Sequence, residues 1–141
     1  MGETVKALMI GDVVGESGGA RPGRRLGADI VVANGENAAG GFGITKDESD
    51  KLFSLGVDAI TSGNHVWEKK GSAELLDGTP SLLRPANYPP GAPGHGLAIV
   101  ESGGAVFAVL NLQGREGLYP IDCPFRTADA ILEKVRAERP V

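Results

Sequence analysis

Polar residues able to bind metal ions follow three apolar segments of the sequence. Asp12 comes after the first segment, Glu36 and Asn37 after the second, and Asn64 and His65 after the third. Each set lies beside a glycine, which allows the backbone to turn sharply. Oxygen ligands combined with imidazole suit divalent metals such as manganese, iron and magnesium. The pattern therefore indicates a metal site built from several loops.

Such a site suits the hydrolysis of phosphate esters. Two ions about 3.5–4 Å apart acidify a water molecule and neutralise the charge that develops on the phosphate. A carboxylate such as Glu36 can bridge two ions, and Asn64 can bind one without adding negative charge. His65 lies next to a predicted ligand, and imidazole is a common proton donor to a leaving group. Arg84 and Arg115, which also end apolar segments, either bind a phosphate oxygen or pair with a nearby carboxylate.

Each of these residues also has a structural interpretation. An Asp after a buried strand is more often a turn or helix-capping residue than a ligand, and a lone His such as His65 can be a hydrogen-bonded core residue. The metal-site interpretation of Asp12 is favoured because Glu36 and Asn64 occupy equivalent positions after neighbouring segments.

The elements that must position these residues are short strands and helices. Apolar runs rich in Val, Ile and Leu predict buried strands at residues 5–10, 30–33, 57–61 and 106–110. A capping box of Thr45 and Glu48, with Gly56 as a stop signal, predicts a helix over residues 46–55. A weaker pattern, interrupted by Gly71, predicts a second helix over residues 67–76.

The second half of the chain predicts a hairpin and a further helix. Residues 97–101 and 105–110 flank a Ser-Gly-Gly turn. The last helix is expected to bury one face formed by Ala128, Ile131, Leu132 and Val135. Strands alternating with helices predict an α/β fold with a mainly parallel sheet, whose ligands bind at the carboxyl ends of the strands. Residues 16–28 must join the first two strands, but their four glycines and one proline oppose a helical crossover.

Composition excludes several classes of function. The net charge is −4, no run of Lys or Arg exceeds two residues, and only 5% of residues are aromatic, so no extended nucleic-acid surface is expected. No apolar stretch reaches the length of about 18 residues that a membrane span needs. Cys123 is the single cysteine, which indicates a reducing compartment, and the N-terminus does not resemble a signal peptide. We therefore expect a cytoplasmic protein.

Five segments, in order along the chain, resemble the YmdB-like bacterial metallophosphoesterases of the calcineurin-like superfamily. They are Ile10-Gly-Asp-Val-Val-Gly15, Asn34-Gly-Glu-Asn-Ala-Ala39, Ser62-Gly-Asn-His-Val-Trp67, Leu83-Arg-Pro-Ala-Asn-Tyr-Pro89 and Asn111-Leu-Gln-Gly-Arg115. The resemblance implies a four-layered α/β/β/α sandwich. It also implies hydrolysis of phosphodiesters such as 2′,3′-cyclic nucleotides through a water activated by two iron or manganese ions.

By the same resemblance, each predicted site residue has a role. Asp12 and Asn37 would bind the first metal, Glu36 would bridge the two, Asn64 would bind the second, and His65 would donate the proton. A dinucleotide-binding Rossmann site is disfavoured because no Gly-x-Gly-x-x-Gly follows the first strand.

The chain resembles only the first half of these proteins. Family members are nearly twice as long, and their second half supplies three more metal-binding histidines, whereas this chain has only His65 and His95. We therefore expect residues 1–141 to form a single incomplete domain with an exposed apolar surface that favours self-association. The alternative to an enzyme is a non-catalytic fragment or remnant with at most weak metal or phosphate binding.

Overall fold

Two sheets form the centre of the protein, as seen in a computed structural model that describes residues 4–15 and 27–138. The first sheet is parallel throughout, with the strand order β1 (Ala7–Ile10), β2 (Ile30–Asn34), β3 (Ala59–Thr61) and β4 (Leu82–Leu83). The second is the antiparallel hairpin of β5 (Leu97–Ser102) and β6 (Ala105–Leu110). The predicted hairpin is confirmed, and its turn contains Gly103 and Gly104 with φ angles of 59° and 81°, which a two-residue turn of this kind requires.

The helices are α2 (Lys46–Ser54), the short 3-10 helix η1 (Asn64–Trp67), α3 (Ser72–Gly78) and α4 (Pro124–Glu138). The predicted capping box is present, since the Glu48 carboxylate accepts a hydrogen bond of 3.2 Å from the backbone N–H of Thr45. The single helix predicted over residues 67–76 is wrong. Gly71 adopts a left-handed φ of 81° and separates η1 from α3.

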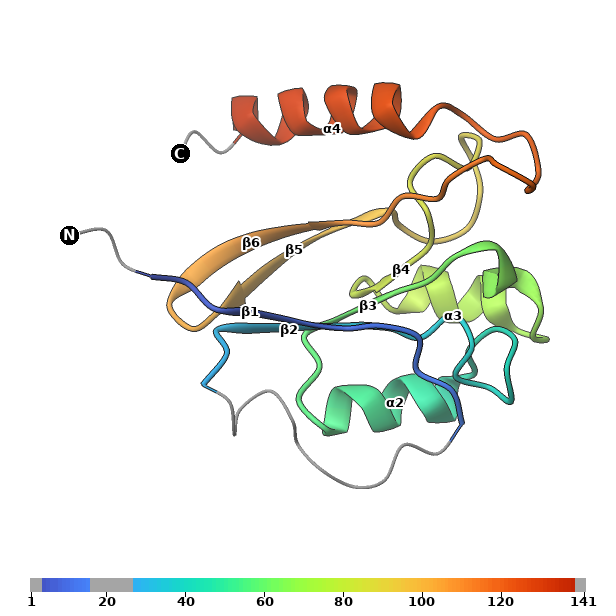
Figure 1. Cartoon of the computed structure of the whole chain (residues 1–141), viewed down its shortest axis with the longest axis horizontal. Coiled ribbons are helices and arrows are strands. Elements are labelled where there is room, and N and C mark those ends of the chain that lie inside the picture. The colour runs from blue at the N-terminus through green and yellow to red at the C-terminus, as the bar shows by residue number, and fades with distance from the viewer. Residues whose placement is uncertain (1–3, 16–26, 139–141) are drawn as a thin grey trace.

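The layers follow the order helix, sheet, sheet, helix. Figure 1 shows α2 and α3 on one side of the parallel sheet, the hairpin on its other side, and α4 beyond the hairpin. The α/β/β/α arrangement that the family resemblance implied is thus confirmed for this chain.

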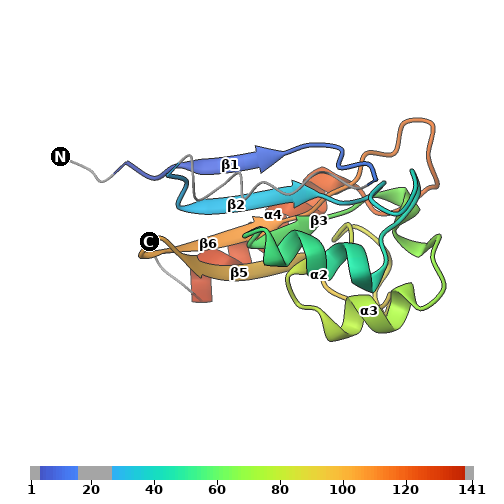
Figure 2. The ribbon, with the colours of Figure 1, turned by 90° about the horizontal axis from the view of Figure 1, so that it is seen from below.

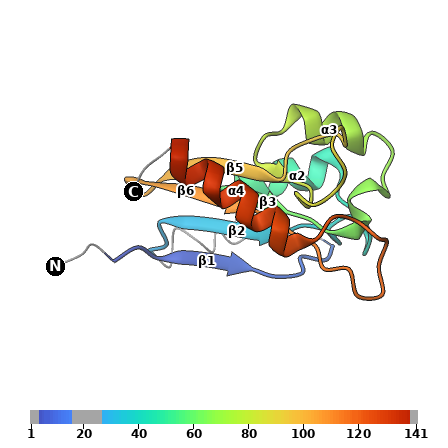
Figure 3. The same cartoon turned by 90° about the horizontal axis from the view of Figure 1, so that it is seen from above.

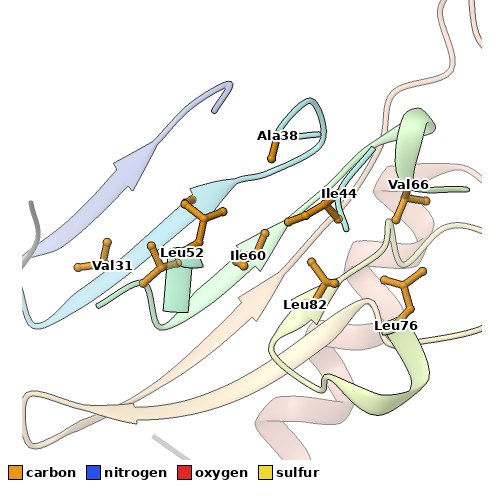
Figure 4. Packing of buried hydrophobic residues seen from close by; sticks show 10 residues of the cluster. Val31, Ala38, Ile44, Leu52, Ile60, Val66, Leu76 and Leu82 are labelled. Carbon is orange, nitrogen blue, oxygen red and sulfur yellow. The ribbon is translucent and has the colours of Figure 1, made fainter. Parts of the chain in front are cut away.

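Alternate residues of the parallel sheet face the two neighbouring layers. Figure 4 shows the helical side, where Val31 and Ile60 pack with Leu52, Val66 and Leu76. On the opposite side a smaller cluster, formed by Ile30, Val32 and Ala59, packs against Val100, Phe107 and Val109 of the hairpin. Because both faces of β2 and β3 are covered, these strands lack the polar alternation of a half-exposed sheet.

The hairpin does not cover the whole parallel sheet. Figures 2 and 3, from opposite sides, show β1 outside the strip that the hairpin occupies. Met9 pairs in register with the buried Val32, yet its side chain is 69% exposed. The outer helix α4 was expected to bury one face, but none of its residues is fully buried and Leu132 is 41% exposed. In the described part of the chain, the layer beneath this helix has only two strands.

Residues 16–26 of the unusual connection between β1 and β2 lie outside the described residues, so its predicted irregularity stays a prediction. Within the described parts of the chain, no helix has the length and apolar character needed to cross a bilayer.

Replacing Ile60 by alanine should lower the free energy of unfolding by about 2–5 kcal/mol, because the fully buried side chain leaves a cavity between β3 and the helices. Met9→Ala, in the exposed edge strand of the same sheet, should change it by less than about 0.5 kcal/mol. Urea denaturation of both variants measures the difference. Equal losses would contradict this assignment of the core.

We expect the chain to self-associate through its exposed apolar side chains, which include Met9, Val106, Tyr119 and Phe125. Size-exclusion chromatography with light scattering should give a mass above that of one chain. Met9→Gln should lower this mass, whereas Lys70→Gln, at another exposed position, should not. A stable monomer at all concentrations would overturn the expectation.

Candidate active site

The carboxyl ends of β1, β2 and β3 lie at one edge of the parallel sheet, as Figure 2 shows. Backbone hydrogen bonds continue past the strands: the N–H of Val13 donates to Asn34 O at 3.0 Å, and that of Gly35 donates to Thr61 O at 2.9 Å. The three loops therefore leave the sheet side by side. Asp12 and Glu36 lie in the first two loops and Asn64 follows the third, so all three are at the same edge rather than on opposite edges.

Asp12 and Asn37 form a side-chain pair across the first two loops. Asn37 Nδ2 donates a hydrogen bond of 2.8 Å to Asp12 Oδ1. The other amide atom, Asn37 Oδ1, is buried and accepts no hydrogen bond from any residue that the structure describes. A buried acceptor without a partner is unfavourable, and a bound cation would satisfy it. This pair therefore fits the oxygen ligands of a divalent metal.

Glu36 is held against the backbone of the third loop. A Cβ atom added to Gly63 would lie 2.1 Å from Glu36 Oε2, so the carboxylate occupies the space that any side chain at this position would fill. The backbone N–H of His65 points at Glu36 Oε1 from 3.4 Å, a long hydrogen bond. Gly63 was not predicted to be a functional residue, although it lies between two of the quoted motif residues, Ser62 and Asn64.

His65 lies in η1 with its ring oriented by two neighbours. Its Nδ1 atom is buried, 3.6 Å from Glu68 Oε1, and makes no hydrogen bond with the described residues. The ring of Phe42 contacts the imidazole edge-on, with centroids 5.7 Å apart. Because the side chain as a whole is 33% exposed, the accessible part of the ring lies away from Nδ1.

Asn64 begins η1 and is half-buried, and its side chain makes no hydrogen bond to another residue of the described chain. The structure thus brings Asp12 to Asn37 and Glu36 to His65 at one edge, with Asn64 beside them. Across residues 4–15 and 27–138, no three His, Cys, Asp or Glu side chains form a group able to hold an ion. The metal-binding roles therefore remain predictions.

Arg84 and Arg115 lie away from this group of ligands. The Arg84 guanidinium donates hydrogen bonds to the carbonyl oxygens of Pro85, Ala92 and Pro93, at 2.8, 3.4 and 3.1 Å. Burial lowers the pKa of Arg84 from its ordinary value. Its hydrogen bonds hold the loop of residues 84–96, which is rich in proline and glycine. Arg115 is exposed and lines a separate cavity. Substrate binding by either arginine stays a prediction.

A buried polar network joins the loops behind the site. Asn111 Nδ2 donates to Ser62 O at 2.9 Å and to Leu83 O at 3.0 Å, and Asn87 Nδ2 donates to Gln113 O at 2.8 Å. These bonds tie the segments after β3, β4 and β6 together. Asn87 and Asn111 were not predicted to have a role, but both lie in the quoted motifs, and this position was the signal in the sequence.

Comparisons with known proteins place this geometry in a family. The sequence profile of the YmdB-like proteins matches residues 8–141. The chain is 41% identical to the 2′,3′-cyclic-nucleotide 2′-phosphodiesterase of Bacillus subtilis, over 96% of this chain and 54% of that protein. It is 29% identical to a putative phosphatase/phosphodiesterase of Mycoplasma pneumoniae, over 92% of this chain and 48% of that protein.

Solved structures agree with these matches. A hypothetical protein from Thermus thermophilus superposes with a TM-score of 0.81 at 39% identity, over 91% of this chain and 52% of that one. A structure described as a novel phosphatase from Mycoplasma pneumoniae superposes with a TM-score of 0.77 at 27% identity, over 95% and 52% of the two chains. The chain spans about half the length of the curated relatives it matches. In sequence and in fold, this chain belongs to the YmdB-like protein family.

Proposed function

We propose that this chain supplies part of a two-metal site that hydrolyses phosphodiesters such as 2′,3′-cyclic nucleotides. The observation that carries the proposal is the unpartnered Oδ1 of Asn37, buried beside the Asp12 carboxylate at the edge where Glu36 also lies. Similarity to a 2′,3′-cyclic-nucleotide 2′-phosphodiesterase supports the choice of substrate.

The proposed ligands divide between two metal positions. Asp12 and Asn37 would hold the first ion, and Asn64 the second, with Glu36 placed between the loops that carry them. When bound, two iron or manganese ions would neutralise charge on the phosphate and make a water molecule more acidic. The set contains only two carboxylates, so ligands beyond it are needed to hold two ions firmly.

His65 would deliver the proton that the leaving alkoxide requires. Since Nδ1 is buried beside Glu68, Nε2 is the atom proposed to face the substrate. The edge-on contact with Phe42 would limit rotation of the imidazole and keep Nε2 directed at the leaving group.

A second candidate is a non-catalytic protein that binds at most one metal weakly. It is favoured by the lack of a complete ion-binding group of His, Cys, Asp and Glu in the described chain. Both interpretations place a metal at Asp12 and Asn37. Only the enzyme interpretation requires that a complete site hydrolyse the phosphodiester.

The chain alone should bind Mn²⁺ weakly and show negligible turnover of an aryl phosphodiester or a 2′,3′-cyclic nucleotide. Gly63→Ala should weaken metal binding a further 10–100-fold, roughly the effect of losing a residue that positions a ligand, because the new Cβ would displace the Glu36 carboxylate. Gly78→Ala, where a Cβ meets no atom within 4 Å, is the control. Calorimetric titration with Mn²⁺ measures the metal affinity of both variants. Two tightly held ions per chain, with turnover abolished by His65→Ala, would refute the prediction of weak binding.

A chimera tests the proposed reaction directly. In it, this chain replaces the matching part of the Bacillus subtilis relative, so that the rest of that protein completes the domain. We expect hydrolysis of a 2′,3′-cyclic nucleotide that requires iron or manganese. His65→Ala should lower kcat about 10²–10⁴-fold, as loss of a general acid does. His95→Ala, in an exposed loop, should leave kcat unchanged. A folded chimera that binds two ions but leaves the substrate intact would favour the non-catalytic interpretation.

A further inference from the structure

An open cavity lies between α4 and the segments that follow β4 and β6. Its volume is about 640 Å³, within the range of small-molecule sites. The helix contributes Arg126 and Ile131, the segment after β6 contributes Arg115 and Ile121, and the segment after β4 contributes Tyr88. None of the residues proposed to bind metal lines this cavity.

The charges around the cavity are mostly positive. Among the residues that the structure describes, three arginines line it together with one acidic residue, Asp122. The Arg84 guanidinium already donates hydrogen bonds to three loop carbonyl oxygens, as described above. The side chains of Arg115 and Arg126, by contrast, form no hydrogen bond or ion pair with any residue of the described chain. Two guanidinium groups therefore remain available for an anion, which they can bind through paired N–H donors.

The surroundings of Cys123, which lines the cavity, favour a negative charge. The backbone N–H of Arg126 lowers the pKa of the Cys123 thiol below its usual value, while burial acts in the opposite direction. The N–H of Phe125 and the charges of Arg115 and Arg126 lower this pKa further. The arginine side chains supply the positive charge that a ligand in this cavity would meet.

We propose that this cavity binds a small organic molecule through a phosphate group held by Arg115 and Arg126. The apolar side chains of Ile121 and Ile131 and the ring of Tyr88 form a wall that suits the organic part better than a free ion. The inference does not rest on the proposed metal site, because it needs neither a metal ion nor hydrolysis.

The single cysteine provides a reporter for the test. Alkylation of Cys123 by iodoacetamide is measured in EDTA with increasing adenosine 5′-monophosphate or inorganic phosphate, and with potassium chloride at matched ionic strength. A bound phosphate offsets the arginine charges and should slow alkylation to a saturating limit, because the thiolate is the reactive form. The nucleotide should saturate at a lower concentration than inorganic phosphate.

Variants of the arginines separate specific binding from charge screening. Arg115→Gln and Arg126→Gln should each raise the half-saturating concentration about tenfold, since each removes a charge-assisted contact. Arg136→Gln, in the last turn of the same helix, should leave it unchanged. Calorimetric titration of the nucleotide into Cys123→Ser gives the affinity without the thiol.

Several results would overturn the inference. A built phosphate site would be excluded if potassium chloride slowed alkylation of Cys123 as much as phosphate does. It would also be excluded if phosphate still protected Cys123 in the Arg115→Gln/Arg126→Gln double variant, or if Cys123→Ser gave no heat of binding. Equal affinity for the nucleotide and inorganic phosphate would exclude the organic ligand. The outcome is independent of the metal site, because every measurement is made in EDTA.

Discussion

The continuation of the parallel hydrogen-bond ladder beyond the strands is the constraint on which the site depends. Val13 and Gly35 extend the pairing of β1 with β2 and of β2 with β3 by one further bond each. A loop that leaves a sheet without such a bond can swing away from its neighbour, whereas these loops start in fixed register. Asp12 and Glu36 flank these two bonded residues, so their separation is set by backbone pairing before any side chain makes contact.

The two layers around the sheet allow this edge to be polar. Ile60 and Val31 are buried on the helical side and Val32 on the hairpin side, so the strands are held by apolar contacts along their length. Behind the edge, the Asn111 amide donates to the buried carbonyl oxygens of Ser62 and Leu83, and the Ser62 hydroxyl also donates to Leu83 O. The loops can therefore display unpaired acceptors such as Asn37 Oδ1 without loss of the fold.

Sequence patterns predicted the parts of the structure that local chemistry determines. The capping box at Thr45 and the hairpin turn at Gly103 depend on neighbouring residues and were found where expected. β4 was missed because its two residues make no recognisable apolar run, and the helix over residues 67–76 failed because the left-handed conformation at Gly71 breaks it. The contact of Glu36 with Gly63 joins the loops after two different strands, which no local pattern encodes. The partners of Arg84 are likewise set by the path of its loop.

Asp12 adopts a φ of 47°, in the left-handed region that few residues other than Gly, Asn and Asp accept readily. The backbone would therefore tolerate Asn or Gly at this position, but each removes the negative charge. Glu keeps the charge, yet it lacks the short side chain that suits this conformation. Under selection for folding alone, position 12 would vary among aspartate, asparagine and glycine. Retention of an aspartate there is thus a signature of selection for chemistry, which can be sought in the natural variation of related sequences.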